Sequence, residues 1–313
     1  MCLPFRLWWV YLPNDYKRPN DGKPKGRVED VGVRIIPRLD IKGPNLVKGI
    51  HFEGLRVLGK PEQFARYYYA QGADELIYMD AVASLYRRNS LLELVAKTAS
   101  EIFIPLTVGG GLRTVDDIRK VLRAGADKVS LNTAAIERPD LIREASRAFG
   151  SSTILVSIET IKQSDGTYQA FTDYGRQRTG LDAFEWALRA VEYGAGELMV
   201  TSIDQEGTGK GFDVELIRRI AESVPIPVIA GGGAGAVNDV SEVITRGRAD
   251  AVCLASILHY ACAGELASKE EQFQEEGNIE FLRGGRGFKN VHGTTLPSMK
   301  RHLAANGIDC RLQ

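Results

Sequence analysis

The 313-residue chain lacks the features of several protein classes. It has no apolar run near the roughly 18 residues that cross a bilayer. Acidic and basic residues number 40 each, so no net charge indicates nucleic acid or a membrane surface as a partner. The four cysteines show no CxxC or other metal spacing, and we expect reduced thiols in a cytoplasmic protein.

Cofactor signatures are missing as well. The four histidines form no ligand cluster, and His259 is expected to be structural rather than catalytic. We therefore expect neither a metal nor an organic cofactor. A doubly wound nucleotide-binding fold, the runner-up architecture, would need G-x-G-x-x-G directly after the first strand, and nothing similar follows Asp40.

What the chain does have is an internal repeat. Ala-Asp-Glu-Leu-Ile-Tyr-Met (73–79) resembles Ala-Gly-Glu-Leu-Met-Val-Thr (195–201), and Pro-Leu-Thr-Val-Gly-Gly-Gly (105–111) resembles Pro-Val-Ile-Ala-Gly-Gly-Gly (227–233). Residues 125–133 resemble 248–256, so the three pairs are 122 or 123 residues apart. A period of that length exceeds a solenoid unit and predicts two duplicated half-domains.

Short β-branched runs alternate with amphipathic helical stretches from residue 33 onward. Such alternation predicts βαβ units and a parallel sheet. The predicted strands are Val33–Asp40, Glu75–Asp80, Ile104–Gly109, Lys128–Leu131, Thr153–Glu159, Glu197–Thr201, Val228–Ala230 and Ala251–Leu254. Eight strands with a two-fold repeat favour a closed (β/α)8 barrel, in which the C-terminal face carries the chemistry.

Three segments exceed a minimal barrel. Residues 1–30 form an appendage that we expect to be poorly ordered, which leaves 31–313 for the barrel. Ile41–Lys60 is predicted to be a mobile loop over the mouth, and 261–293 is predicted to be a charged, glycine-rich insertion.

Each triple-glycine turn lies between a predicted strand and a helix, where backbone N–H groups can approach an anion. A turn with further donors follows one strand later in each half. The residues predicted to bind phosphate are Gly110, Gly111, Asn132, Thr133, Gly232, Gly233, Ala255 and Ser256. Two such sites predict a ligand with a negatively charged group at each end.

Two acids end corresponding strands of the two halves. Asp40 ends the first strand and Glu159 ends the fifth, so they should face each other across the barrel mouth. Two carboxyl groups between two phosphate sites suit general acid and general base roles.

Charged residues also begin four of the predicted strands. They are Arg34, Glu75, Lys128 and Glu197. Two cations and two anions at this level could form a neutral ring across the barrel floor, and the alternative is a set of ordinary surface pairs.

These motifs resemble the cyclase subunits of imidazole glycerol phosphate synthase, the HisF family of histidine biosynthesis. The resemblance runs from about residue 33 to 260, is carried by segments such as Arg34–Lys42, Thr107–Thr114 and Ile229–Gly235, and resumes at Leu296–Leu312. It implies a lyase that takes ammonia from a glutaminase partner docked on the barrel floor. The implied substrate is a ribulosyl-aminoimidazole carboxamide bisphosphate, and the products are imidazole glycerol phosphate and the carboxamide ribotide.

The resemblance also implies roles for individual residues. Asp40 would be a catalytic acid/base, Lys48 would help to close the first loop over the substrate, and Gly207 would contact phosphate. The four charges at the strand beginnings would be the gate through which ammonia enters.

The chain departs from the family pattern at three positions. Glu159 and Glu206 stand where the family has aspartate, and Arg38 replaces a cysteine. A carboxyl group moved by one methylene can cost a large factor in rate. Arg38 could bind an anionic ligand if its side chain points inward.

Four functions therefore remain open. The standard cyclase is favoured by the phosphate sites, Asp40, Lys48 and the charge ring. The three departures would suit a relative that delivers ammonia to another acceptor, such as a surface-glycan sugar. A third reading is a non-catalytic barrel that binds a bisphosphate and scaffolds its glutaminase. The related pathway isomerase is the fourth, and an ammonia gate argues against it.

Overall fold

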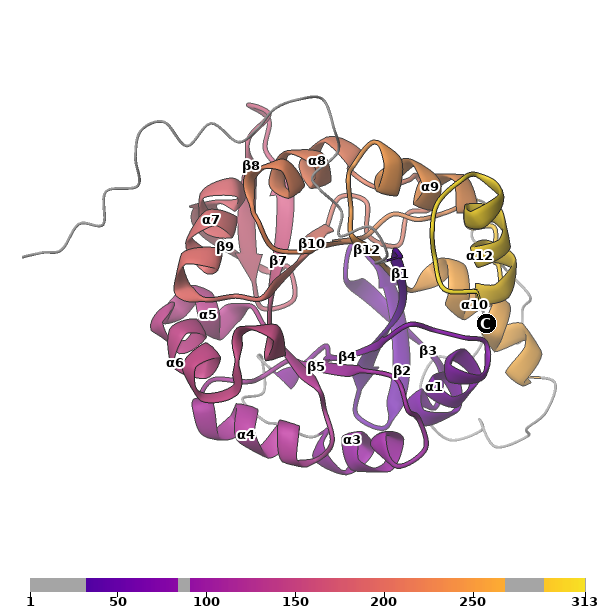
Figure 1. Ribbon diagram of the computed structural model, residues 1–313, viewed down its shortest axis with the longest axis horizontal. Coiled ribbons are helices and arrows are strands. Elements are labelled where there is room, and N and C mark those ends of the chain that lie inside the picture. The colour runs from indigo at the N-terminus through magenta and orange to yellow at the C-terminus, as the bar shows by residue number, and fades with distance from the viewer. Residues whose placement is uncertain (1–31, 84–90, 268–289, 313) are drawn as a thin grey trace, which may run out of the picture. The chain divides into compact units, whose positions relative to one another are not determined.

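Eight parallel strands close into a barrel, with the hydrogen-bonded order β10-β11-β12-β1-β4-β5-β6-β7 and a final pairing of β7 with β10 (Figure 1). The barrel strands are β1 (Arg34–Lys42), β4 (Leu76–Asp80), β5 (Leu106–Gly109), β6 (Lys128–Leu131), β7 (Ile154–Lys162), β10 (Glu197–Ser202), β11 (Val228–Gly231) and β12 (Ala251–Leu254). All eight predicted strands are present, and their ends agree to within three residues.

Helices surround the strands and cover the outside of the barrel (Figure 1). They are α1 (Pro61–Ala70), α3 (Leu92–Ala99), α4 (Val115–Arg123), α5 (Thr133–Glu137), α6 (Asp140–Phe149), α7 (Ala183–Tyr193), α8 (Val214–Ser223), α9 (Val237–Thr245), α10 (Ser256–Ala267) and α12 (Leu296–Ala305), with a short 3-10 turn at Ser151–Thr153. The predicted (β/α)8 barrel is therefore confirmed.

The structure describes residues 32–83, 91–267 and 290–312. The predicted appendage at 1–30 lies outside this part of the chain, as does the stretch 268–289 of the predicted insertion. The first residues of that predicted insertion, 261–267, continue helix α10. No helix within the described ranges is long and apolar enough to cross a membrane.

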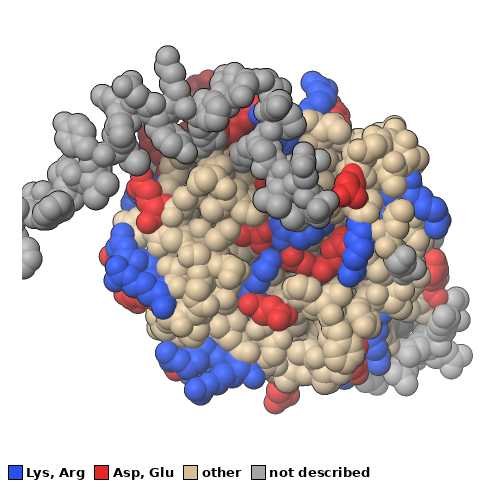
Figure 2. Space-filling view, in the orientation of Figure 1, with Lys and Arg blue, Asp and Glu red and all other residues tan. Residues whose placement is uncertain are grey.

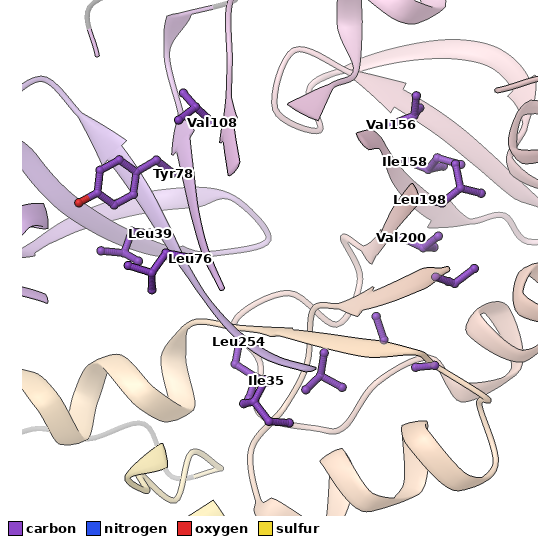
Figure 3. Packing of buried hydrophobic residues seen from close by; sticks show 14 of the residues in the cluster. Ile35, Leu39, Leu76, Tyr78, Val108, Val156, Ile158, Leu198, Val200 and Leu254 are labelled. Carbon is purple, nitrogen blue, oxygen red and sulfur yellow. The ribbon is translucent and has the colours of Figure 1, made fainter. Parts of the chain in front are cut away.

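The core lies between the strands and the helices. Successive side chains of a strand point to opposite faces, so alternate apolar residues turn outward and pack under the helices. Figure 3 shows this layer with Ile35 and Leu39 of β1 and Leu198 and Val200 of β10. This layer forms the larger of the two apolar clusters of the barrel strands.

The inner faces of the strands carry a second, smaller cluster. Its members are Ile36, Ile77, Met79, Leu155, Met199, Ile229, Ala251 and Cys253. Because Ile36 is an inward residue, the same alternation turns Arg34, Arg38 and Asp40 inward along β1. Charged groups thus line the lumen of the barrel at both its N-terminal and its C-terminal end.

Two antiparallel hairpins extend the barrel at its C-terminal face. After β1 the chain forms β2 (Asn45–Ile50) and β3 (Glu53–Gly59), and after β7 it forms β8 (Tyr168–Thr172) and β9 (Gln177–Asp182). The predicted loop Ile41–Lys60 is thus a paired hairpin. Each hairpin follows the first strand of a predicted half-domain.

Candidate active site

Two pockets open at the C-terminal face, one on each triple-glycine turn. Lining residues of the first include Gly110, Gly111, Asn132, Thr133 and Glu159. Lining residues of the second include Gly207, Gly232, Gly233, Ala255, Ser256 and Arg38. Every residue predicted to bind phosphate therefore lines one of the two pockets.

The glycines are also required by the packing of the strands. Gly110 has a φ of +100°, and a Cβ atom there would lie 2.6 Å from the carbonyl oxygen of Asp80. Gly232 has a φ of +85°, and its Cβ would lie 2.7 Å from the carbonyl oxygen of Ser202. Glycine thus serves both purposes, since it allows the close strand contact and leaves the backbone N–H groups accessible to an anion.

Asp40 lies between two cations. The Arg38 Nε donates to Asp40 Oδ1 at 2.9 Å, and the Lys48 Nζ lies 3.9 Å from Asp40 Oδ2. Lys48 also forms a short ion pair with Glu206. All four side chains are buried, and their charges sum to zero, as buried ions require. The structure thus brings the predicted Asp40 and Lys48 together, and it shows that Arg38 points inward.

Glu159 has different surroundings. Burial raises the pKa of its carboxyl group to about 7, Arg38 opposes this shift, and the Asp40 charge adds to it. A backbone N–H of Gly175 donates to the carboxyl, while Oε2 has no hydrogen-bond partner in the described part of the chain. An acid with a pKa near neutrality, beside the first glycine pocket, suits proton transfer.

His259 supports the backbone of β1 from outside the barrel. Its Nε2 donates to the carbonyl oxygen of Arg38 at 2.8 Å, and the Tyr68 hydroxyl lies 2.6 Å from Nδ1. Burial lowers the pKa of His259 to about 3, so the ring is neutral, with Nδ1 accepting from Tyr68. These contacts agree with the predicted structural role.

The four charges at the strand beginnings form a closed ring. Arg34 donates to Glu75 at 2.6 Å and makes a short bond to Glu197, and Lys128 reaches Glu75 at 3.1 Å and Glu197 at 3.2 Å. Each cation thus contacts both anions. The ring closes the N-terminal end of the lumen. Figure 2 shows acidic and basic side chains next to one another at the centre of the face that is turned toward the viewer.

Sequence reasoning missed several lining residues of the first pocket, among them Asp80, Arg113 and Tyr174. Asp80 ends β4, which is the same signal that identified Asp40 and Glu159. Tyr174 comes from the turn between β8 and β9, and its ring packs on Phe52 of the other hairpin with centroids 4.3 Å apart. Only the tertiary structure places it there. No cluster of three potential metal ligands occurs among the described residues.

Comparison with known proteins identifies the family of the chain. A family model described as histidine biosynthesis protein matches residues 34–263. The imidazole glycerol phosphate synthase subunit HisF of Legionella pneumophila is 57% identical over 207 residues, which cover 66% of this chain and 98% of that protein. The chain belongs to the HisF family. The HisF subunit of Alkaliphilus metalliredigens is 46% identical over 227 residues, covering 72% of this chain and 90% of that protein.

The structure also places the three residues at which we expect the chain to depart from the HisF family pattern. Arg38, Glu159 and Glu206 all carry buried side chains at the C-terminal end of the lumen. Glu159 lines the first pocket, and Arg38 and Glu206 line the second.

Proposed function

We propose that this barrel is the cyclase subunit of imidazole glycerol phosphate synthase, a lyase of histidine biosynthesis in the cytoplasm. It combines ammonia with the ribulosyl-aminoimidazole carboxamide bisphosphate and releases imidazole glycerol phosphate and the carboxamide ribotide. The observation that carries this proposal is the pair of glycine-lined pockets on either side of Asp40 and Glu159. A substrate with a phosphate at each end would span them and hold its reacting centre between the two acids.

Asp40 and Glu159 would divide the proton transfers between them. Glu159 can gain and lose a proton near neutral pH, since burial raises its pKa to about 7. Asp40 accepts a hydrogen bond from Arg38 and lies near Lys48, and its carboxylate would accept a proton on the opposite side of the reacting centre. Lys48 on β2 would hold the hairpin over the bound substrate.

Ammonia would enter from the opposite end of the barrel. Four buried hydroxyl groups lie on the barrel strands between the charge ring and the C-terminal face. They belong to Thr107, Ser130, Ser157 and Thr201, and within the described ranges their oxygens have no hydrogen-bond partner. A small polar molecule that both donates and accepts hydrogen bonds could satisfy these groups in turn. The ring of Arg34, Glu75, Lys128 and Glu197 would then act as the gate.

A glutaminase would dock on the face that carries the ring. Both relatives are named as a subunit of imidazole glycerol phosphate synthase, which implies a partner. Phe103 lies just before β5 at this end of the barrel, and its side chain is 81% exposed. Large exposed aromatic residues are common anchors of protein interfaces.

The test is turnover of the bisphosphate substrate by the purified protein with an ammonium salt at alkaline pH. We expect turnover in the wild type and a loss of at least about 100-fold in D40N, because a proton-transfer group contributes roughly 10²–10⁴ to the rate. Binding of the bisphosphate without turnover would contradict the proposal and favour the scaffolding role.

The inward Arg38 favours one second candidate, a barrel that delivers ammonia to another acceptor such as a surface-glycan sugar. Arg38 adds a buried cation to the second pocket, where the family pattern has an uncharged side chain. In this case a nucleotide-linked sugar, and not the histidine intermediate, should raise the thermal unfolding temperature.

A further inference from the structure

The Arg38 guanidinium has donor capacity that no residue in the described part of the chain uses. Its Nε donates to Asp40 Oδ1 at 2.9 Å, whereas Nη2 is buried and has no hydrogen-bond partner among the residues that the structure describes. The side chain is 3% exposed and lines the second pocket beside Gly232 and Gly233. A buried charged donor without a partner is costly, so a ligand is expected to complete it.

The two pockets differ at this position. The offset of 119 residues that relates Asp40 to Glu159 also relates Arg38 to Ser157, an uncharged side chain. The cation of the first pocket is Arg113, and its guanidinium reaches the carbonyl oxygens of Ala83 and Gly111 at 3.3 and 3.4 Å. The second pocket thus has a cation in the barrel wall that the first pocket lacks.

Neighbouring groups hold both the backbone and the side chain of Arg38 in place. Its carbonyl oxygen accepts from His259, its Nε is held by Asp40, and its guanidinium carbon lies 5.1 Å from the ring centre of Phe52. A guanidinium held from two sides on a fixed backbone loses little further freedom when it binds an anion, and it suits the fixed geometry of a phosphate group.

We propose that Arg38 is a phosphate ligand of the second pocket. Nη2 donates to one terminal phosphate of the substrate, while the backbone N–H groups of Gly232 and Gly233 bind the other oxygens. Nε keeps its hydrogen bond to Asp40. The Arg38 side chain would therefore both bind the phosphate and position the catalytic carboxylate. The identity of the substrate rests on the proposed function, but phosphate binding at this pocket does not.

Inorganic phosphate binding tests this proposal without any need for turnover. Affinities at the two sites are measured by calorimetric titration of the wild type, R38Q and S157A, where S157A is the matched change in the other half of the barrel. We expect R38Q to weaken one of the two sites roughly 10- to 100-fold, as the loss of a charge-assisted hydrogen bond implies, and to leave the other unchanged. S157A should keep both affinities.

Equal phosphate affinities in R38Q and the wild type would overturn the proposal. If R38Q does not fold, a crystal structure of the wild type with phosphate decides. An oxygen about 3 Å from Nη2 supports the proposal, and phosphate bound in the pocket away from Arg38 overturns it. Phosphate binding that depends on Arg38 in a protein without cyclase turnover would overturn the proposed function alone.

Discussion

Asp40 and Glu159 occupy corresponding positions on β1 and β7, yet their surroundings differ. Asp40 is paired with Arg38 and lies near Lys48, whereas the hydrogen bond to Glu159 comes from the backbone of Gly175. The partners of a buried carboxyl group determine which of its protonation states is favoured. We therefore propose that Asp40 acts as the general base and Glu159 as the general acid.

The first prediction concerns Glu159 and the stability of the fold. Its folded-state pKa of about 7 lies above its ordinary value of 4.5, so the folded protein binds this proton more tightly than the unfolded chain. The carboxyl therefore destabilises the fold progressively as the pH rises from 4.5 through 7. We expect the free energy of unfolding of E159Q to exceed that of the wild type by about 1–3 kcal/mol at high pH, with no difference at low pH.

Denaturant unfolding across this pH range measures the difference, and turnover of the same variant should be lost. D40N serves as the contrast, because it leaves the Arg38 and Lys48 cations with one anion fewer and should lower stability at neutral pH. A pH-independent stability difference for E159Q would show that Glu159 is already charged in the folded protein.

At the scale of elements, the β2–β3 hairpin is fastened over the second pocket. The His51 N–H donates to the Glu206 carbonyl oxygen at 2.8 Å, and the Lys48 side chain pairs with the Glu206 carboxylate. Gly207 packs against the hairpin backbone so closely that a Cβ there would lie 2.5 Å from the carbonyl oxygen of Gly49. The hairpin and the turn after β10 are therefore joined by a backbone hydrogen bond, an ion pair and close packing.

The second prediction tests this closure with G207A. The new methyl group must displace the hairpin, so we expect kcat/KM to fall by roughly 10- to 100-fold, since misplacement of about 1 Å can cost that factor. G43A is the matched control. Gly43 also has a positive φ, +62° against +74° at Gly207, but nothing lies within 4 Å of its Cβ position.

Steady-state kinetics and thermal unfolding of both variants provide the comparison. G43A should lose only about 1 kcal/mol of stability from backbone strain and keep its activity. Similar kinetics in the two variants would show that the hairpin does not need to close for turnover.

At the scale of the whole molecule, the barrel lumen connects two chemically different ends. The charge ring closes the N-terminal end, and the acids and glycine pockets lie at the C-terminal end. The apolar cluster around Ile36 and Met199 lies between them, beside the buried hydroxyl groups. In the proposed function, this arrangement would separate the entry of ammonia from the binding of the substrate.

The third prediction concerns coupling between the two ends. K128M opens the ring by removing the cation that reaches both Glu75 and Glu197. We expect turnover with glutamine and the partner glutaminase to fall at least about tenfold, because uncoupled ammonia escapes. Turnover with a free ammonium salt should stay within about twofold, because the catalytic acids are untouched.

K97M is the matched control, since Lys97 forms an ion pair with Glu62 on the exposed helical surface. Both activities are measured for each variant under the same conditions. An equal loss of both activities in K128M would assign the ring a purely structural role.

Much of the site could be predicted from sequence because it depends on patterns among residues that are close together in the chain. Strand alternation determines which residues of β1 and β7 face inward, and a glycine turn between a strand and a helix leaves backbone N–H groups accessible to an anion. The sequence therefore sufficed for the barrel, the two pockets and the inward placement of Asp40 and Glu159.

The tertiary structure alone decided which partners these groups acquire. Tyr174 and Lys48 reach the site from hairpins whose positions depend on contacts with distant turns. The contacts of Lys48 with Asp40 and Glu206, and the pKa of Glu159, follow from burial and from charges on other elements. Such effects depend on distance and desolvation in three dimensions, and one sequence determines them only through the complete fold.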